Sequence, residues 1–261
     1  MLVKASKKQQ RLAALIKEAG DSIRIDDAVK VFGVDRQKAA KLLAGWHNQG
    51  NLRRIARGLY VPVNPSALGR QQVLDDPWGL VPELYSPGYI GGWTALEYWE
   101  LTEQLFRSVC VLTAKRATYG DIVHQGVTFY IKHISETQIL GTKSVWRDRV
   151  KVQVSDPHKT ILDILNDPKI GAGLQHVLDV MAAYAKEYGT KNNLEQLLDY
   201  ADRIGNGALF KKLGYAAEKT GWEPWFLDEC HTRLTKGYAY FGDQAAENKL
   251  VTKWHLWVPK G

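Results

Sequence analysis

The sequence has few of the features that mark secreted, membrane-spanning or metal-binding proteins. It contains only two cysteines in 261 residues, Cys110 and Cys230, and they belong to no paired spacing. No apolar run approaches the ~18 residues that a membrane span needs. No hydrophobic stretch follows the lysines near the N-terminus, so a secretory signal is not predicted. We expect a cytoplasmic protein that does not bind membranes.

Enzyme and metal signatures are also missing. The seven histidines lack zinc-site spacing, and neither a phosphate-binding loop nor a Gly-x-Ser-x-Gly elbow occurs. The Gly91-Gly92 pair lacks the spacing of a dinucleotide fingerprint, so close packing or a turn is the better interpretation. Asp156 precedes Pro157 as a helix cap precedes a first-turn proline, which favours structure over catalysis. The sequence therefore predicts no enzyme, no metal and no cofactor.

The positive charge is concentrated in the first quarter of the chain. The net charge of the whole protein is +7. Residues 1–61 hold 13 Lys and Arg against five Asp and Glu, which gives +8 for that segment. The remaining 200 residues therefore sum to −1. This distribution predicts a basic module attached to a neutral body.

Helical patterns and a turn fill the first part of this basic module. Apolar residues at Leu12, Leu15, Ile16 and Ala19 predict a helix over Lys7–Ala19, which Gly20 ends. Asp26 is expected to cap a second helix that runs to Phe32, and Asp35 a third that ends near Gln49. The third helix buries Ala39, Leu42, Leu43 and Trp46 in this prediction, and small residues at Ala44 and Gly45 would permit close approach to a groove. The residues expected to face DNA from this helix are Gln37, Lys38, Lys41 and Asn48, with Arg36 at a phosphate near the helix start.

A basic hairpin is predicted after the third helix. Two β-prone runs flank Ala56-Arg57-Gly58, with glycine at the turn. Together with the preceding helices this predicts a winged helix-turn-helix. Strand alternation sends Arg53 and Arg54 to opposite faces, so we expect one of them to join Arg57 at the phosphates. Short three-helix domains also mediate protein contacts, but the charge and the exposed small residues favour DNA.

The rest of the chain predicts a mixed body, so the fold class is α+β. We place a winged helix-turn-helix domain in residues 1–63, with a proline-containing linker over Val61–Pro65, and a second domain in residues 64–261. Strands are expected at 108–113, 126–131 and 149–154, followed by a helix that buries Ile161, Leu162 and Leu165. Residues 166–235 are expected to be mainly helical, with Lys211 and Lys212 on a solvated face, and the tail extended. The tryptophans of the body are expected in its core.

Four segments in order resemble the AbiEi-type antitoxin family of abortive-infection, type IV toxin–antitoxin systems. They are the wing Asn51–Val61, the turn Gly91–Leu96, the strand-to-helix segment Val154–Asp163 and the late Lys212–Tyr215, within a resemblance that spans about residues 8–260. The resemblance implies an N-terminal winged helix that represses its own operon at inverted repeats in double-stranded DNA. It also implies a C-terminal antitoxin domain that counters a nucleotidyltransferase-like toxin without a stable complex, in phage defence.

Two other functions stay open at this point. The chain could be a nuclease or nucleotide-modifying enzyme that the winged helix targets, with Asp156, His158 and Asp163 as its acids and base. It could also be a transcriptional regulator whose aromatic-rich body binds a ligand or protein, unrelated to any toxin. A nucleotidyltransferase-like reading frame next to the gene would favour the antitoxin.

Overall fold

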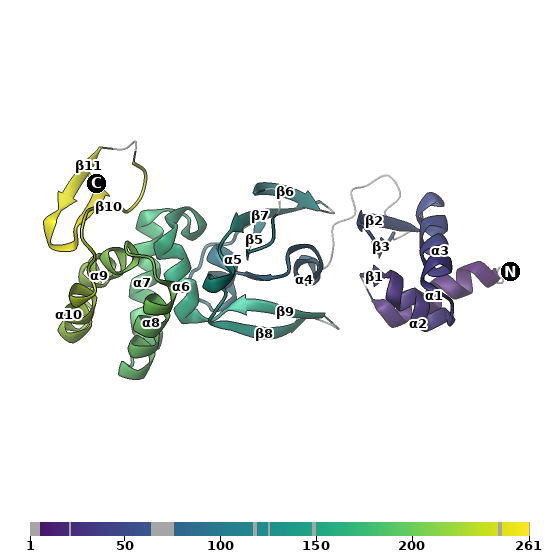
Figure 1. Cartoon of the computed structure of the whole chain (residues 1–261), viewed down its shortest axis with the longest axis horizontal. Coiled ribbons are helices and arrows are strands. Elements are labelled where there is room, and N and C mark those ends of the chain that lie inside the picture. The colour runs from purple at the N-terminus through teal and green to yellow at the C-terminus, as the bar shows by residue number, and fades with distance from the viewer. Residues whose placement is uncertain are drawn as a thin grey trace.

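The computed structural model describes residues 6–20, 22–63, 76–116, 119–124, 126–147, 150–244 and 247–260. The chain runs from an N-terminal helical domain, through a central sheet, to a bundle of helices and a small C-terminal sheet (Figure 1). Helices and sheets are both prominent, and the fold class is α+β as predicted. Among the described residues, no helix has the length and apolar character needed to cross a bilayer.

The N-terminal domain has the element order of a winged helix-turn-helix. Its small sheet has the order β1-β3-β2, in which both pairs are antiparallel. The predicted first and third helices and the hairpin are confirmed, although Val61 and Pro62 belong to the hairpin rather than to a linker. The rest of that linker, Asn64 and Pro65, and the predicted strand start Arg149 lie outside the described residues. The elements are α1 (Lys7–Ala19), β1 (Ile23–Arg24), α2 (Ile25–Phe32), α3 (Arg36–Asn48), β2 (Leu52–Ala56) and β3 (Leu59–Pro62).

The expected cap of α2 was wrong by two positions. The helix begins at Ile25 with Arg24 in the cap position, and Asp26 lies in the first turn. The carboxylate that meets the exposed end of the helix is that of Asp27, which accepts a hydrogen bond from the backbone N–H of Arg24 at 2.7 Å. Two consecutive aspartates made the choice ambiguous, because either can serve the first turn of a helix.

A single apolar cluster holds this domain together. Trp46 of α3 is buried, and its ring lies 5.9 Å from that of Phe32, at the end of α2. Ala39 and Leu43 are buried as predicted, whereas Leu42 is only half-buried. The packing fixes α3 by one stripe and leaves its opposite side to solvent. The buried members are Leu15, Ile23, Ala28, Ala39, Leu43, Trp46, Leu52 and Tyr60.

A mixed sheet forms the centre of the body. It has six strands in the part of the chain that the structure describes. Its order is β6-β7-β5-β4-β9-β8. The pairs β5–β7 and β4–β9 are parallel and the others are antiparallel. The strands are β4 (Gly88–Ile90), β5 (Ser108–Thr113), β6 (Gly120–His124), β7 (Val127–His133), β8 (Thr142–Arg147) and β9 (Val150–Ser155).

Successive residues of β5 serve two cores, because side chains alternate between the faces of a sheet. Val109 and Val111 join Val81 and Tyr85 of α4 on one face. Cys110 and Leu112 join the helical part of the body on the other face. The wing also meets the first of these cores through Leu59, and Arg24 forms an ion pair with Glu83. The flanking helices are η2 (Pro77–Leu80), α4 (Val81–Tyr85), α5 (Gly92–Tyr98) and α6 (Pro157–Asn166).

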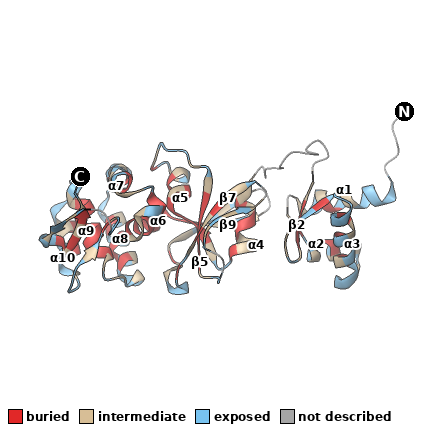
Figure 2. Ribbon diagram, turned by 90° about the horizontal axis from the view of Figure 1, so that it is seen from above, coloured by how far each residue is buried: buried red, intermediate tan, exposed pale blue. Residues whose placement is uncertain are grey.

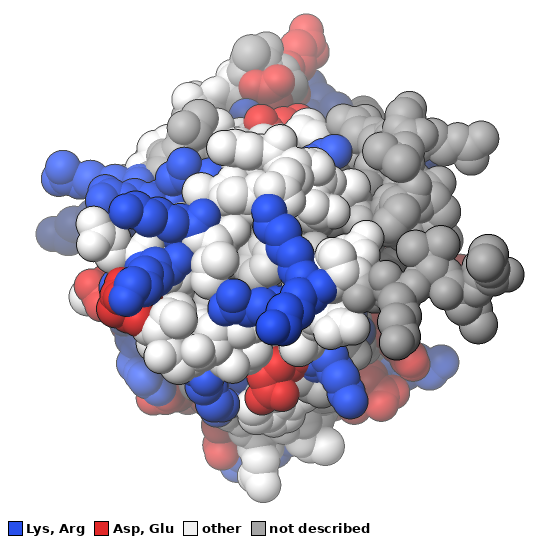
Figure 3. Space-filling view, turned by 90° about the vertical axis from the view of Figure 1, so that its right-hand side faces the viewer, with Lys and Arg blue, Asp and Glu red and all other residues white. Residues whose placement is uncertain are grey.

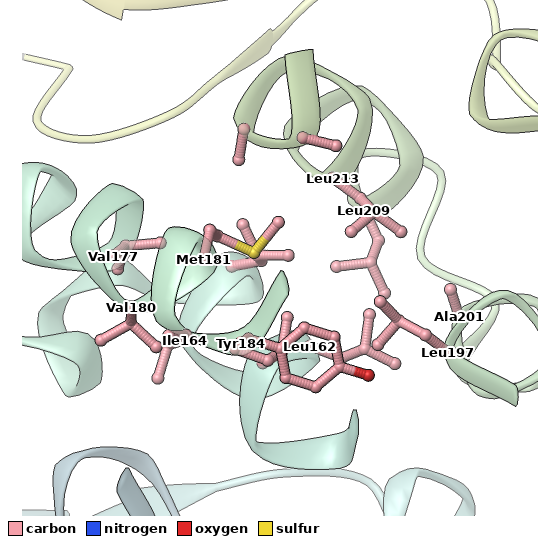
Figure 4. Packing of buried hydrophobic residues seen from close by; sticks show 14 of the residues in the cluster. Leu162, Ile164, Val177, Val180, Met181, Tyr184, Leu197, Ala201, Leu209 and Leu213 are labelled. Carbon is pink, nitrogen blue, oxygen red and sulfur yellow. The ribbon is translucent and has the colours of Figure 1, made fainter. Parts of the chain in front are cut away.

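Helix α6 is the centre of the helical part and is buried along most of its length. Leucine, isoleucine and valine side chains of α6 to α9, together with Met181 and Tyr184, interdigitate around it (Figure 4). The predicted burial of Ile161, Leu162 and Leu165 is confirmed. Figure 2 shows buried residues on each of these helices. The remaining helices are η3 (Glu136–Gln138), η4 (Pro168–Gly171), α7 (Leu174–Tyr188), α8 (Lys191–Ile204), α9 (Leu209–Lys219) and α10 (Pro224–Thr232).

The prediction that Lys211 and Lys212 form a solvated basic spot was wrong. Their residues are 3% and 8% exposed, because α9 packs on several sides. Each ammonium group reaches a backbone carbonyl: Lys211 donates to Gly237 and Lys212 to Asn166, both at 2.8 Å. Long lysine stems can be buried in this way when the charged end finds an acceptor.

The extended tail is confirmed as a small sheet of order β10-β12-β11. Leu256 and Val258 of its central strand are buried against the helical core, as is Trp254, whereas Trp146 on β8 is exposed. The expectation of tryptophans in the core therefore holds for Trp254 and fails for Trp146. The elements are β10 (Ala239–Tyr240), β11 (Asn248–Val251), η5 (Thr252–Trp254) and β12 (Leu256–Pro259).

Candidate nucleic-acid interface

The start of α3 is fixed by a side-chain cap. The carboxylate of Asp35 accepts a hydrogen bond from the backbone N–H of Lys38 at 2.8 Å, as the sequence predicted. This hydrogen bond lowers the pKa of Asp35, so the cap is ionised at neutral pH. The Lys38 ammonium also lies 3.2 Å from the Asp35 carboxylate. These contacts fix the start of α3.

The polar side of α3 is free of protein packing. Gln37, Lys38, Lys41 and Asn48 are all exposed, on the side opposite the buried stripe. Ala44 lies among them, and a Cβ built on Gly45 would meet no atom within 4 Å. Amide and ammonium groups beside small residues are suited to reading base edges at close range. The structure therefore brings the four predicted groove-facing residues onto one accessible surface.

Arg36 is engaged within the protein. Its guanidinium forms an ion pair with Asp26 of α2, and both side chains are about two-thirds exposed, at 68% and 67%. An exposed pair of this kind contributes little to stability, so a phosphate could take over the guanidinium. The predicted phosphate contact of Arg36 thus requires that the guanidinium exchange Asp26, a partner that was not predicted from the sequence, for a phosphate.

The wing is a tight hairpin with an arginine at its tip. Arg57 and Gly58 form the turn between Ala56 and Leu59, which pair across it. Gly58 has a φ of +80°, a conformation that glycine adopts at little cost. A register shift between Arg54 and Ala56 marks a bulge. The side chains of Arg53 and Arg57 are exposed at the rim of the hairpin.

Arg54 is directed back toward the hairpin itself. Its Nε donates to the carbonyl of Ala56 at 3.2 Å, next to the bulge. Arg53 pairs in register with Val61 and Arg54 with Tyr60, so the two arginines project to opposite faces, as predicted. Both arginines are exposed, so the prediction that one of them joins Arg57 stays open between the two.

A further arginine, Arg11 of α1, lies next to the turn between α2 and α3. Its guanidinium carbon is 4.6 Å from the ring centre of Phe32, and the side chain is exposed. Arg11 was not predicted as a site residue, because the pattern of α1 places it only on a polar face. Figure 3 shows Lys and Arg side chains gathered on this end of the molecule, with few acidic ones among them. The basic charge of the first quarter therefore forms a surface.

The acids and base of the enzyme hypothesis are engaged separately on α6. Asp156 caps the helix by accepting from the Lys159 N–H at 2.8 Å, and it also accepts from the Tyr200 hydroxyl at 3.0 Å. His158 Nδ1 is hydrogen-bonded to the Tyr184 hydroxyl, and burial lowers the pKa of this histidine. Asp163 lies beyond them, in an ion pair with Lys159. Each group has a structural partner, and the three do not face a common cavity described in the structure.

Gly91 and Gly92 serve close packing, as the sequence indicated. A Cβ on Gly92 would lie 2.7 Å from both the Cys110 sulfur and the Ile170 carbonyl oxygen, and its φ is +52°. The short strand β4 precedes these glycines, which the sequence analysis did not identify. In the described part of the chain, no group of three or more His, Cys, Asp and Glu residues is arranged to hold a metal ion.

Comparisons with known proteins add a fold relationship. No family profile and no curated protein matches the chain. Among solved structures, the chain is similar to the crystal structure of the RV2827C protein from Mycobacterium tuberculosis, with a TM-score of 0.62 and 13% sequence identity. The match covers 98% of this chain and 92% of that one, so the similarity extends over both the N-terminal domain and the body. At this identity the likeness concerns the fold alone.

Proposed function

We propose that the chain binds double-stranded DNA through its N-terminal domain. The observation that carries this proposal is the exposed face of α3, on which Gln37, Lys38, Lys41 and Asn48 surround the small Ala44 and Gly45. In a winged helix-turn-helix such a helix enters the major groove. The basic wing and the net charge of +8 over residues 1–61 supply the attraction for phosphates.

Each group has a defined role in this proposal. Gln37, Lys38, Lys41 and Asn48 contact base edges or nearby phosphates from the groove. Arg57, with Arg53 or Arg54, holds the DNA backbone at the wing. Arg36 releases Asp26 to bind a phosphate at the start of α3. Phosphate contacts position the domain, and base contacts give it sequence specificity.

We further propose that this DNA lies in the promoter of the protein's own operon and that the protein is a cytoplasmic repressor and antitoxin without enzymatic activity. The support is the ordered resemblance to AbiEi-type antitoxins. The operator would contain inverted repeats, and the body, residues 64–261, would counter a nucleotidyltransferase-like toxin without a stable complex. The engagement of Asp156, His158 and Asp163 in structural contacts supports the non-enzymatic role over the nuclease alternative.

A binding assay with a labelled upstream promoter fragment tests the DNA proposal. Arg57→Ala should weaken binding to all sequences alike and reduce the salt slope by about one unit. Gln37→Ala should weaken the binding free energy by about 1–3 kcal/mol and relax the sequence preference at one base position of the operator. Lys186→Ala, which removes an exposed cation of α7, is the matched control and should bind as wild type does. Wild-type affinity in both Lys41→Ala and Arg57→Ala would refute the proposed interface.

Co-expression with the adjacent toxin gene tests the antitoxin proposal separately. The full-length Lys41→Ala/Arg57→Ala protein, made from an unrelated promoter, should still rescue growth, because the antitoxin function is assigned to the body. Failure of the wild-type protein to rescue growth would overturn the antitoxin proposal. It would leave the result of the DNA-binding assay unaffected.

A further inference from the structure

The C-terminal sheet exposes aromatic rings on one face, at the end of the molecule opposite the winged helix (Figure 1). Tyr238 and Tyr240 are 59% and 40% exposed. The ring of Tyr240 lies nearly parallel to that of Trp257, with ring centres 6.3 Å apart. The ring centres of Tyr238 and His255 lie 5.6 Å apart. Leu250 pairs with Trp257 in register and is also exposed. Two ring pairs and a leucine thus form a surface, which we call the aromatic face.

The aromatic face does not belong to the core of the body. Leu256 and Val258, which alternate with Trp257 on β12, are buried, so the opposite side of the sheet meets the core. The backbone pairing of β10 and β11 with β12 fixes the rings from both sides. Tyrosines at this exposure gain little from folding, and their rigid, flat rings are available for a partner.

The segment that carries the aromatic face is basic in composition, unlike the neighbouring helices. Residues 233–260 carry five Lys and Arg against two Asp and Glu. Residues 166–232 carry seven against ten. Lys236, two residues before Tyr238, is exposed. Lys249, in contrast, pairs in register with the buried Val258 and so lies on the face opposite Tyr240 and Trp257. The two segments together sum to zero, so a count over residues 166–261 conceals a basic C-terminal segment beside an acidic helical part.

We propose that the aromatic face binds single-stranded nucleic acid, with bases stacked on Tyr238 and Tyr240 and a phosphate near Lys236. Exposed aromatic rings within a basic surface are the elements that recognise unpaired bases. Two residues of a strand span about 6.6 Å, nearly twice the ~3.4 Å between stacked bases of a duplex. Neighbouring rings on the strand thus fit the bases of an extended single strand and not those of a duplex.

Fluorescence anisotropy of the full-length protein with labelled 12-nucleotide oligo(U), oligo(dT) and a mixed-sequence duplex tests this proposal. Tyr238→Ala and Tyr240→Ala should each weaken oligonucleotide binding roughly 5- to 150-fold, the loss per stacked base converted to an affinity ratio. Duplex binding should stay unchanged. Tyr240→Phe should retain binding, and Trp146→Ala, at an exposed tryptophan of β8, is the matched control. The two oligonucleotides distinguish RNA from DNA.

The winged helix is a second basic surface, so the Lys41→Ala/Arg57→Ala protein should bind oligo(U) or oligo(dT) as wild type does. Absence of oligonucleotide binding, or binding that this variant loses and Tyr240→Ala keeps, overturns the proposal. Sedimentation measures the oligomeric state in parallel. A wild-type oligomer that Tyr240→Ala dissociates would make the aromatic face an interface between copies of the chain, and the proposal would likewise fall.

Discussion

The ammonium group of Lys159 and the carboxylate of Asp163, one turn apart on α6, form an ion pair whose side chains are 2% and 6% exposed. The hydroxyl of Tyr89 lies beside both: it accepts from Lys159 at 2.7 Å and donates to Asp163 at 3.0 Å. Burial raises the pKa of Asp163, and the charge of Lys159 opposes part of that rise. The Tyr89 hydroxyl thus links this ion pair of α6 to β4, in a region where an unpaired charge would be costly.

We expect Lys159→Met and Asp163→Leu each to lower the free energy of unfolding by about 3–5 kcal/mol, because each leaves an uncompensated buried charge. The double variant should lose less than the sum, since neither charge is then buried. Chemical denaturation of the four proteins measures the coupling. Additive losses would show that the two groups act independently.

The enzyme alternative has a separate test at the same residue. If the protein has a hydrolytic activity and Asp163→Asn abolishes it while the protein stays folded, the enzyme alternative is supported.

The burial of Lys212 leads to a second prediction, which concerns how the free energy of unfolding depends on pH. Burial lowers the pKa of its ammonium group to about 8, from the usual lysine value of 10.5. Between these two values the unfolded chain binds more protons than the folded one, so this residue makes stability rise with pH. Its contribution to the rise is of order 3 kcal/mol. Tyrosines and cysteines also titrate near this range, so the difference between wild type and Lys212→Met isolates the lysine. Identical pH profiles in the two proteins would contradict the shifted pKa.

The sequence predicted local structure well where one signal dominated. Asp35 and Asp156 stand before amphipathic helices, and both proved to be side-chain caps. The short β8 was missed because Lys143, Ser144 and Arg147 interrupt its apolar pattern. In the fold, Lys143 and Arg147 lie over the rings of Trp99 and Trp78, partners distant in the sequence.

The candidate interface was predictable for the same reason: helical periodicity alone places Gln37 and Lys41 opposite the buried stripe of α3. The partner of Arg36 was not predictable, because the distance between Asp26 and Arg36 depends on how α2 and α3 cross. The burial of Lys212 likewise depends on the carbonyl of Asn166, supplied by another helix. Charge counts identified the basic module, but the zero net charge of residues 166–261 conceals the basic C-terminal segment.

Two helical glycines should respond in opposite ways to alanine. A Cβ at Gly45 enters open space, whereas one at Gly214 would lie 2.0 Å from Cζ3 of the buried Trp254. Gly45→Ala should therefore raise the free energy of unfolding by about 0.5–1 kcal/mol, and Gly214→Ala should lower it. Gly45→Leu should leave the fold intact but weaken operator binding, since the larger side chain separates α3 from the groove. Operator affinity unchanged in Gly45→Leu would show that this part of α3 does not approach DNA closely.

The ion pair between Asp26 and Arg36 leads to a variant that should bind DNA more tightly than wild type. Both side chains are largely exposed, so Asp26→Asn should change stability by no more than about 1 kcal/mol. Freed of its partner, Arg36 can contact a phosphate, and we expect affinity for the promoter fragment to rise with a salt slope steeper by about one unit. The same substitution in an Arg36→Ala protein separates this contact from a general loss of negative charge. If Asp26→Asn raises affinity equally in both proteins, the gain comes from long-range charge, and Arg36 does not bind a phosphate.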